Sequence, residues 1–297
     1  MSDAVPLKPC LALMGEFSAG KSTLANLLIG IKHLPEQIVA TQLPPVWLSF
    51  GENAAFRVDL EGEKHPLDLN HLDEAPLDTT AYIQIFTPQD LLLECDLLDM
   101  PGISDPNMSS EIWQRMLGRA DGVIWCSHAT QAWRQSEAAV WAEQDPALFA
   151  KSLLLLTRID KLVNDGDRGR VLRRVRHETE GLFRACLPIS LLHAVNETDN
   201  PALWRKSGAE EFARALADLL RDISRDKNPQ KGERPVENKS AVLEIPAFKS
   251  SPDEPPDGER EADIATRTHA AHSAQDAKVM PRRIKLERSL RRRSILD

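Results

Sequence analysis

"LALMGEFSAGKSTLANLLIG", residues 11–30, joins an apolar run to the apolar periodicity of a helix, with GEFSAGKS between them. These eight residues have the form G-x-x-x-x-G-K-[ST], which is typical of phosphate-binding loops. The glycines let the backbone curl so that N–H groups point at phosphate oxygens, and the following helix adds partial positive charge. A chance match in a glycine-rich turn is disfavoured because the strand–loop–helix context is correct. The stretch therefore predicts a site for a nucleoside triphosphate.

The residue types in this loop divide the work. Lys21 is expected to reach the β- and γ-phosphates, and the Ser22 hydroxyl to ligate Mg²⁺. We expect the nucleotide to contact the whole loop and the residue after it. This set comprises Gly15, Glu16, Phe17, Ser18, Ala19, Gly20, Lys21, Ser22 and Thr23.

A second motif, DMPG at residues 99–102, ends the apolar run LLLECDLLDM. A carboxylate at the end of a strand beside a phosphate loop can hold Mg²⁺, which gives Asp99 a metal-binding role. Gly102 can bring its N–H to the γ-phosphate and so sense the loss of that group. D-x-P-G alone is also a common structural turn, and its position after a phosphate loop favours the functional interpretation.

The base is predicted to be read by SLLLLTRIDKL, residues 152–162, where Thr157, Arg158 and Asp160 have the form [NT]-[KR]-x-D. A carboxylate accepts two hydrogen bonds from guanine, and adenine lacks that donor pair, so a buried carboxylate left unpaired would reject adenine. The alternative is an Asp that caps the following helix. Ser190, after another apolar run, could contact the base oxygen through its loop backbone or be merely structural.

Short apolar runs alternate with helical patterns over about the first 225 residues. This alternation predicts an α/β fold of the P-loop NTPase class, a mainly parallel sheet flanked by helices. Residues 52–80 are acidic and irregular, and we expect a loop or small hairpin there. Candidate strands are CLALM, VWLSF, AYIQIF, CDLLDM, GVIWCS, SLLLLT and ACLPIS, and candidate helices begin at Lys21, Ser109, Gln135, Asp167 and Gly208.

Composition divides the chain into a globular domain, residues 1–225, and a charged tail, residues 226–297, which is too polar to order itself. The basic end of the tail, residues 281–297, could lie on anionic lipid, dock on an acidic partner or stay solvated.

A net charge of −8 argues against nucleic acid as a partner. The four cysteines lack metal spacing, so we expect buried free thiols. Without a leader or a long apolar run, a cytoplasmic protein is expected, with peripheral membrane contact left open.

The motifs GEFSAGKSTLANLLIG, DLLDMPGISDP and TRIDKLVNDGD together resemble the GTPase domain of the dynamin superfamily, most closely its bacterial dynamin-like branch. The resemblance covers roughly residues 7–224. It implies that Thr41 belongs to a switch that ligates Mg²⁺ and positions the attacking water. It also implies that Ser18 is linked to a monovalent cation, K⁺, in place of an arginine finger.

Two departures qualify the expected activity. Phe17 stands where eukaryotic dynamins have Gln, and Ile103 and Ser104 follow DMPG without a water-orienting Gln. We therefore expect slow intrinsic hydrolysis that a homodimer across the nucleotide stimulates. The chain also leaves no room for the stalk and membrane paddle of the family, so a membrane-severing machine acting alone is not expected.

The leading hypothesis is a GTPase that works as a nucleotide switch with an unidentified protein partner at or near a membrane. The alternative is a GTP-binding scaffold with little turnover that recruits its partner through the tail. A P-loop ATPase is disfavoured by Asp160.

Overall fold

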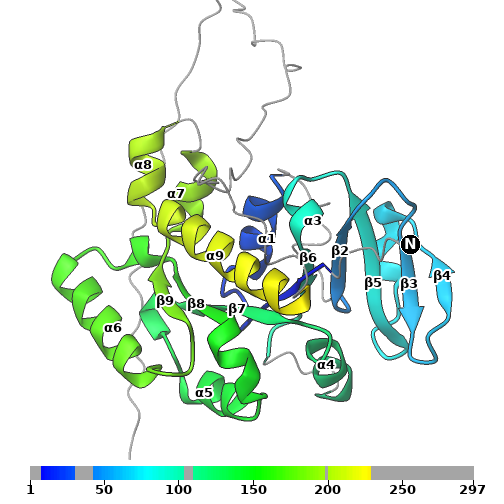
Figure 1. Cartoon of the computed structure of the whole chain (residues 1–297), viewed down its shortest axis with the longest axis horizontal. Coiled ribbons are helices and arrows are strands. Elements are labelled where there is room, and N and C mark those ends of the chain that lie inside the picture. The colour runs from blue at the N-terminus through cyan, green and yellow to red at the C-terminus, as the bar shows by residue number, and fades with distance from the viewer. Residues whose placement is uncertain (1–7, 31–42, 104–109, 198–199, 229–297) are drawn as a thin grey trace, which may run out of the picture. The chain divides into compact units, whose positions relative to one another are not determined.

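A nine-stranded sheet forms the centre of the computed structural model, which describes residues 8–30, 43–103, 110–197 and 200–228 (Figure 1). Its strand order is β4-β3-β5-β2-β6-β1-β7-β8-β9. The strands are β1 (Cys10–Gly15), β2 (Val46–Phe50), β3 (Phe56–Asp59), β4 (Lys64–Pro66), β5 (Thr80–Thr87), β6 (Asp96–Asp99), β7 (Gly122–His128), β8 (Ser152–Thr157) and β9 (Ala185–Pro188).

The run from β6 to β9 is parallel throughout, and β2 is parallel to β5. The antiparallel pairings are β2 with β6, β3 with β4 and β3 with β5. The prediction of a mainly parallel sheet is confirmed. The antiparallel β2–β6 junction separates the parallel run that contains β1 from the four strands β4, β3, β5 and β2.

The helices are α1 (Lys21–Ile29), α3 (Leu91–Glu94), α4 (Ser110–Leu117), α5 (Gln135–Ala142), α6 (Asp165–Glu178), α7 (Leu191–Asn196), α8 (Pro201–Lys206) and α9 (Ala209–Lys227). The predicted starts at Lys21 and Gln135 are confirmed. The α6 helix begins before the predicted Asp167 because the Asn164 side chain accepts from the Gly166 N–H. The predicted start at Ser109 lies outside the described residues.

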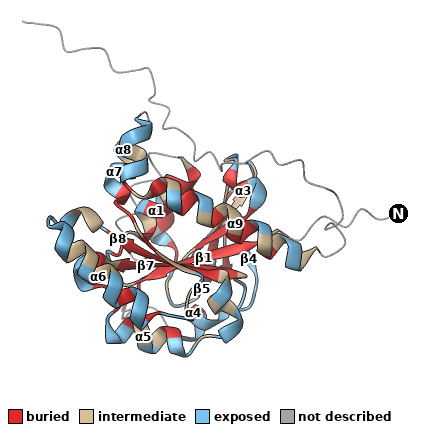
Figure 2. Cartoon of the chain, turned by 60° about the vertical axis from the view of Figure 1, so that its left-hand side comes forward, coloured by how far each residue is buried: buried red, intermediate tan, exposed pale blue. Residues whose placement is uncertain are grey.

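Helices cover both faces of the sheet (Figures 1 and 2). Alternation along β1 sends Leu11 and Leu13 to the face covered by α1, α7 and α9, and Ala12 and Met14 to the face covered by α4, α5 and α6. Both sets of side chains are fully buried, which explains why the central strands read as continuous apolar runs. Within the described ranges, no helix has the length and apolar character that crossing a bilayer requires.

The cysteines match the expectation of free thiols. Cys10, Cys95 and Cys126 are buried, and Cys186 is half-buried. Burial raises the pKa of the Cys10 thiol to about 12, so this side chain behaves as a small apolar group.

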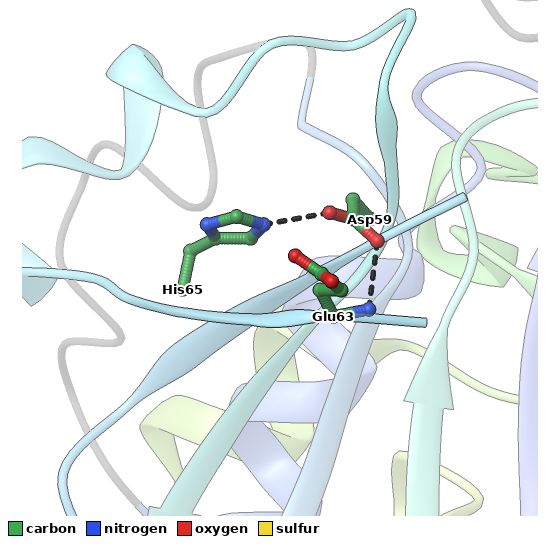
Figure 3. Close-up of side chains that lie close together, drawn as sticks. All are labelled: Asp59, Glu63 and His65. Atoms are coloured by element: carbon green, nitrogen blue, oxygen red, sulfur yellow. Dashed lines mark hydrogen bonds and ion pairs between the residues drawn. The ribbon is translucent and has the colours of Figure 1, made fainter. Parts of the chain in front are cut away.

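The predicted hairpin within residues 52–80 is formed by β3 and β4, and Asp59 stabilises its turn (Figure 3). One carboxylate oxygen accepts the N–H groups of Glu61 and Glu63, and the other lies 2.6 Å from His65 Nε2. The hydrogen bond with His65 is the main cause that lowers the pKa of Asp59. Among the described residues, Asp59, Glu63 and His65 form the one group with the ligand types and proximity for a metal. Because both Asp59 oxygens are already bonded and Glu63 is exposed, we interpret the group as a turn support.

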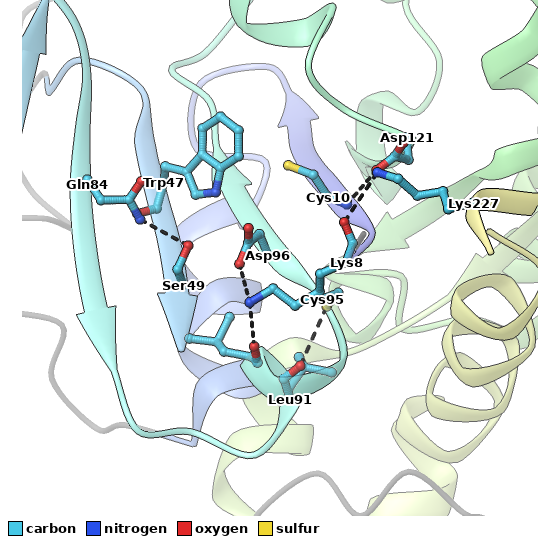
Figure 4. Close-up of polar contacts among 11 residues, drawn as sticks. Lys8, Cys10, Trp47, Ser49, Gln84, Leu91, Cys95, Asp96, Asp121 and Lys227 are labelled. Carbon is cyan, nitrogen blue, oxygen red and sulfur yellow. Dashed lines mark hydrogen bonds and ion pairs between the residues drawn. The ribbon is translucent and has the colours of Figure 1, made fainter. Parts of the chain in front are cut away.

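Two ion pairs, Lys8–Asp96 and Lys227–Asp121, lie at the amino ends of the central strands (Figure 4). Lys8 Nζ lies 2.6 Å from Asp96 Oδ1 and donates to the Leu92 carbonyl. Lys227, at the end of α9, donates to Asp121 Oδ2 at 2.6 Å, and the same oxygen accepts the Cys10 N–H at 2.8 Å. These contacts close α9 onto β1 at the edge of the sheet opposite the phosphate loop.

Candidate nucleotide-binding site

The predicted phosphate loop lies between β1 and α1, where its glycines adopt backbone angles that favour glycine. Gly15 has φ +136° and Gly20 has φ +95°. A Cβ atom on Gly15 would lie 2.0 Å from the Cys126 carbonyl oxygen of the neighbouring strand, so no side chain fits there. The loop therefore depends on close backbone approach to β7 as well as on its own curvature.

Lys21 is held inside this loop. Its side chain is only 8% exposed, and Nζ donates to the carbonyl oxygens of Gly15 at 3.1 Å and Glu16 at 2.9 Å. The contacts keep a buried ammonium group within the concave side of the loop. This is the position from which a lysine reaches the terminal phosphates of a nucleotide.

Asp99 ends β6 and pairs in register with Leu13 of β1, one strand away from the loop. The residue is half-buried, but its Oδ1 atom is buried and has no hydrogen-bond partner. Burial raises the pKa of Asp99 to about 6, and the charge of Lys21 offsets part of this rise.

A buried carboxylate oxygen without a donor fits a hard cation that prefers oxygen ligands. Asp99 and the half-buried Ser22 at the start of α1 are thus suited to hold Mg²⁺. When bound, the ion would neutralise phosphate charge. Thr41, the third predicted ligand, lies outside the described residues.

The DMPG turn packs directly on the phosphate loop. A Cβ atom on Gly102 would lie 3.0 Å from the backbone nitrogen of Phe17 and 3.1 Å from its Cα. The Ile103 N–H donates to the Gly15 carbonyl oxygen at 3.2 Å. Asp99 and Gly102 therefore lie beside the loop as the motif predicts, and Gly102 is needed for this close approach.

The TRID segment is also tied to the phosphate loop. The Thr157 hydroxyl donates to the Ala19 carbonyl oxygen at 2.7 Å, and the Arg158 guanidinium donates to that of Ser18 at 3.0 Å. Asp160 Oδ1 accepts from the Ser190 hydroxyl at 2.7 Å. The structure thus brings all three predicted loops to the carboxyl edge of the sheet, where nucleotides bind in open α/β sheets.

Two details differ from the sequence alternatives. Asp160 does not cap the following helix, because Asn164 caps α6. The second detail is Ser190, whose side chain makes two contacts, whereas the sequence indicates only a role for its loop backbone or a structural one. The hydroxyl orients Asp160 and also accepts from the His193 N–H to cap α7.

Sequence motifs did not reveal a further contact with the phosphate loop. The Ser136 hydroxyl at the start of α5 donates to Glu16 Oε1 at 2.8 Å, across 120 positions of sequence. The next residue, Glu137, is a buried carboxylate. Ser136 and Glu137 are adjacent in the first turn of α5, and nothing in this pair of residues indicates which loop it contacts.

Comparison with known proteins agrees with this geometry. A model of the dynamin family matches residues 11–159. Dynamin-like protein 2 of Campylobacter jejuni is 25% identical over 225 residues, which cover 73% of this chain and 36% of the relative. The isoniazid-induced protein IniC of Mycobacterium tuberculosis is 27% identical over 258 residues, which cover 75% of this chain and 51% of IniC.

A solved structure of an oligomerised bacterial dynamin pair has the same fold. It matches with a TM-score of 0.58 and 19% identity, over 76% of this chain and 41% of that chain. The chain thus spans between about a third and a half of the length of these relatives. The chain belongs to the dynamin family and carries its GTPase domain.

Proposed function

We propose that this GTPase domain works as a GTP-hydrolysing switch that acts with a partner at or near a membrane. The observation that carries the proposal is the meeting of Lys21, Asp99 and Asp160 at one edge of the sheet, each from a different strand end. The proposed contacts with phosphate, metal and base then lie at the same edge of the sheet, as a single bound nucleotide requires.

The residues divide the mechanism among them. Lys21 and the loop N–H groups bind the phosphates, and Asp99 with Ser22 holds Mg²⁺. Asp160, oriented by Ser190, accepts from guanine, while Thr157 and Arg158 brace the phosphate loop against the base-reading segment.

Two catalytic roles come from the family resemblance. In the proposed mechanism Thr41 orients the attacking water and Ser18 holds a monovalent cation. Ser18 adopts a left-handed backbone, with φ +57°. This conformation exposes its side chain on the rim of the loop, which is compatible with that role.

A homodimer across the nucleotide is the proposed active form. Phe17 in the phosphate loop is 72% exposed, and Val163 after the base-reading segment is 89% exposed. Apolar side chains beside a nucleotide site are suited to contact a partner. The matched bacterial pair is described as oligomerised and as sensing and tethering membranes. We extend oligomerisation to this chain. We also propose that residues 281–297, which lie outside the described residues, make weak contact with anionic membrane or with a partner.

A turnover assay with GTP and ATP tests the central proposal. Wild-type protein should prefer GTP, and Asp160→Asn should weaken GTP binding by at least about 100-fold while improving xanthosine nucleotide binding, since the amide donates where xanthine offers a carbonyl. Asp165→Asn, the same change at an exposed residue nearby, is the control. Equal binding of ATP and GTP by wild type would refute base reading by Asp160.

The same assay separates the switch from the scaffold. GTP binding without turnover, even at high protein concentration with K⁺ and anionic vesicles, would favour the scaffold. Removing residues 229–297, which keeps Lys227 and the end of α9, should leave turnover intact and reduce vesicle binding at low salt. Equal vesicle binding by both forms would exclude the tail as the membrane contact.

A further inference from the structure

Glu137 is a buried charged side chain that the proposed mechanism does not use. It lies in the first turn of α5 and is 1% exposed. Oε1 accepts from Trp125 Nε1 at 2.9 Å, and Oε2 accepts from the Ser127 hydroxyl at 3.0 Å and the Arg134 N–H at 2.9 Å. Three donors thus converge on one carboxylate, the arrangement that a buried acidic group needs.

These donors define the path of residues 129–134, which connect β7 to α5. The Ser127 hydroxyl, itself bonded to Glu137, accepts from the Trp133 N–H at 2.9 Å. Trp133 has φ +55°, a left-handed conformation that a bulky residue adopts only where its surroundings impose it. Glu137 therefore fixes both ends of a segment whose backbone is strained.

The residues that flank this segment contact the phosphate loop directly on one side and through Thr157 on the other. The Ser136 hydroxyl donates to Glu16 Oε1 at 2.8 Å. At the other end, the Ser127 carbonyl oxygen lies 3.3 Å from the Thr157 hydroxyl, which donates to Ala19 in the loop. A shift of this segment would consequently displace the contact with Glu16 and, through Thr157, the contact with Ala19.

We propose that Glu137 is a positioning residue for the nucleotide site: it holds the segment after β7 so that Ser136 restrains Glu16 and the phosphate loop keeps its nucleotide-binding shape. The effect on turnover rests on the proposed GTPase function. The effect on nucleotide dissociation requires only binding, so the two can fail separately.

Glu137→Gln is the informative change because it conserves size and removes the charge. A glutamine offers one acceptor oxygen, and its NH₂ group must then face one of the three donors. Ser136→Ala removes only the contact with Glu16, from an exposed position where little stability is at stake. Glu143→Gln is the matched control, an exposed glutamate at the other end of the same helix.

The experiment uses the full chain and measures the dissociation rate of fluorescent GDP with Mg²⁺, kcat and KM for GTP, and the thermal midpoint. Ser136→Ala should accelerate GDP dissociation and lower kcat by about fivefold each, the scale of one hydrogen bond, with the midpoint unchanged. Glu137→Gln should do the same by about tenfold or more. The double variant should be no worse than Glu137→Gln alone, because Glu137 acts in part through Ser136, whose contact with Glu16 is already lost in Glu137→Gln. The control should match wild type.

Several outcomes would overturn the proposal. Wild-type dissociation and kcat in Ser136→Ala would remove the link to Glu16. A lowered midpoint in Glu137→Gln without a change in either rate, measured where the protein is folded, would make the residue merely structural. Effects that multiply in the double variant would show that the two residues act independently. If wild type binds GDP but hydrolyses no GTP, the proposed function fails and dissociation alone still decides this inference. A chain that binds no guanine nucleotide refutes both.

Discussion

Asn in place of Asp99 should stabilise the metal-free protein while it removes the proposed Mg²⁺ ligand. Burial raises the pKa of Asp99 from 3.8 to about 6, despite the favourable charge of Lys21. At about 1.4 kcal/mol for each tenfold change in the acid constant, keeping this carboxylate ionised costs the folded state about 3 kcal/mol. Asp99→Asn keeps the size of the side chain without that cost.

The sign of the pH dependence follows from proton binding. Between pH 3.8 and about 6 the unfolded chain has released this proton and the folded chain has kept it, so wild-type stability falls as pH rises through this window. Well above pH 6, by about pH 7.5, the loss is complete and constant. The variant should lack this decline, so the two proteins should be equally stable near pH 4 and differ by up to about 3 kcal/mol at pH 7.5.

Urea unfolding in EDTA from pH 4 to 8 measures this difference. In a parallel series with Mg²⁺ and GDP the order should reverse, because Mg²⁺ that is bound together with GDP contacts the wild-type carboxylate and stabilises the folded state by mass action. Asp90→Asn, at an exposed carboxylate, serves as the control. Superimposable pH profiles for wild type and Asp99→Asn would refute the raised pKa of Asp99. Equal stabilisation of the two proteins by Mg²⁺ with GDP would refute the role of Asp99 as a metal ligand.

Three further predictions follow from close contacts. Gly15→Ala should cost about 3 kcal/mol or more, because its Cβ would lie 2.0 Å from the Cys126 carbonyl at φ +136°. Chemical denaturation measures this cost, and a loss below about 1 kcal/mol would contradict the packing. Ser190→Ala should weaken GTP binding about tenfold by releasing Asp160, with ATP binding unaffected. Calorimetry measures both affinities, and an equal loss for the two nucleotides would argue against base orientation. Lys227→Met should cost about 1–2 kcal/mol of unfolding free energy, an effect that 0.5 M salt reduces. A salt-independent cost would indicate lost packing.

The sequence predicted which loops lie together at the site better than the contacts that hold them. Lys21, Asp99 and Asp160 could be singled out because each belongs to a motif that follows an apolar strand, and the carboxyl ends of parallel strands meet at one edge of a sheet. The direction of β2 could not be predicted, since the pattern of apolar residues is the same in a parallel and an antiparallel strand. The helix Leu91–Glu94 was hidden because its apolar residues continue into those of the following strand.

The support for the site was missed for a related reason. The donors to Glu137 lie 3, 10 and 12 positions away, and their convergence depends on how β7 and α5 pack. Ser190 was noticed for its place after a strand, but its hydroxyl bond to Asp160 depends on two loops that lie 30 positions apart. Long-range side-chain pairing of this kind has no periodic signature in one sequence.

The junction of Lys8, Asp121 and Lys227 has a mechanical consequence (Figure 4). The first and last described residues are anchored at the same corner of the sheet, opposite the phosphate loop. A load applied between the two ends of this unit would first strain the Lys227–Asp121 contact and peel the end of α9 from β1. The strands that carry the nucleotide would bear that load only after this contact had broken. A force between the two ends of the described residues would therefore break the Lys227–Asp121 contact before it distorted the phosphate loop at the other end of the strands.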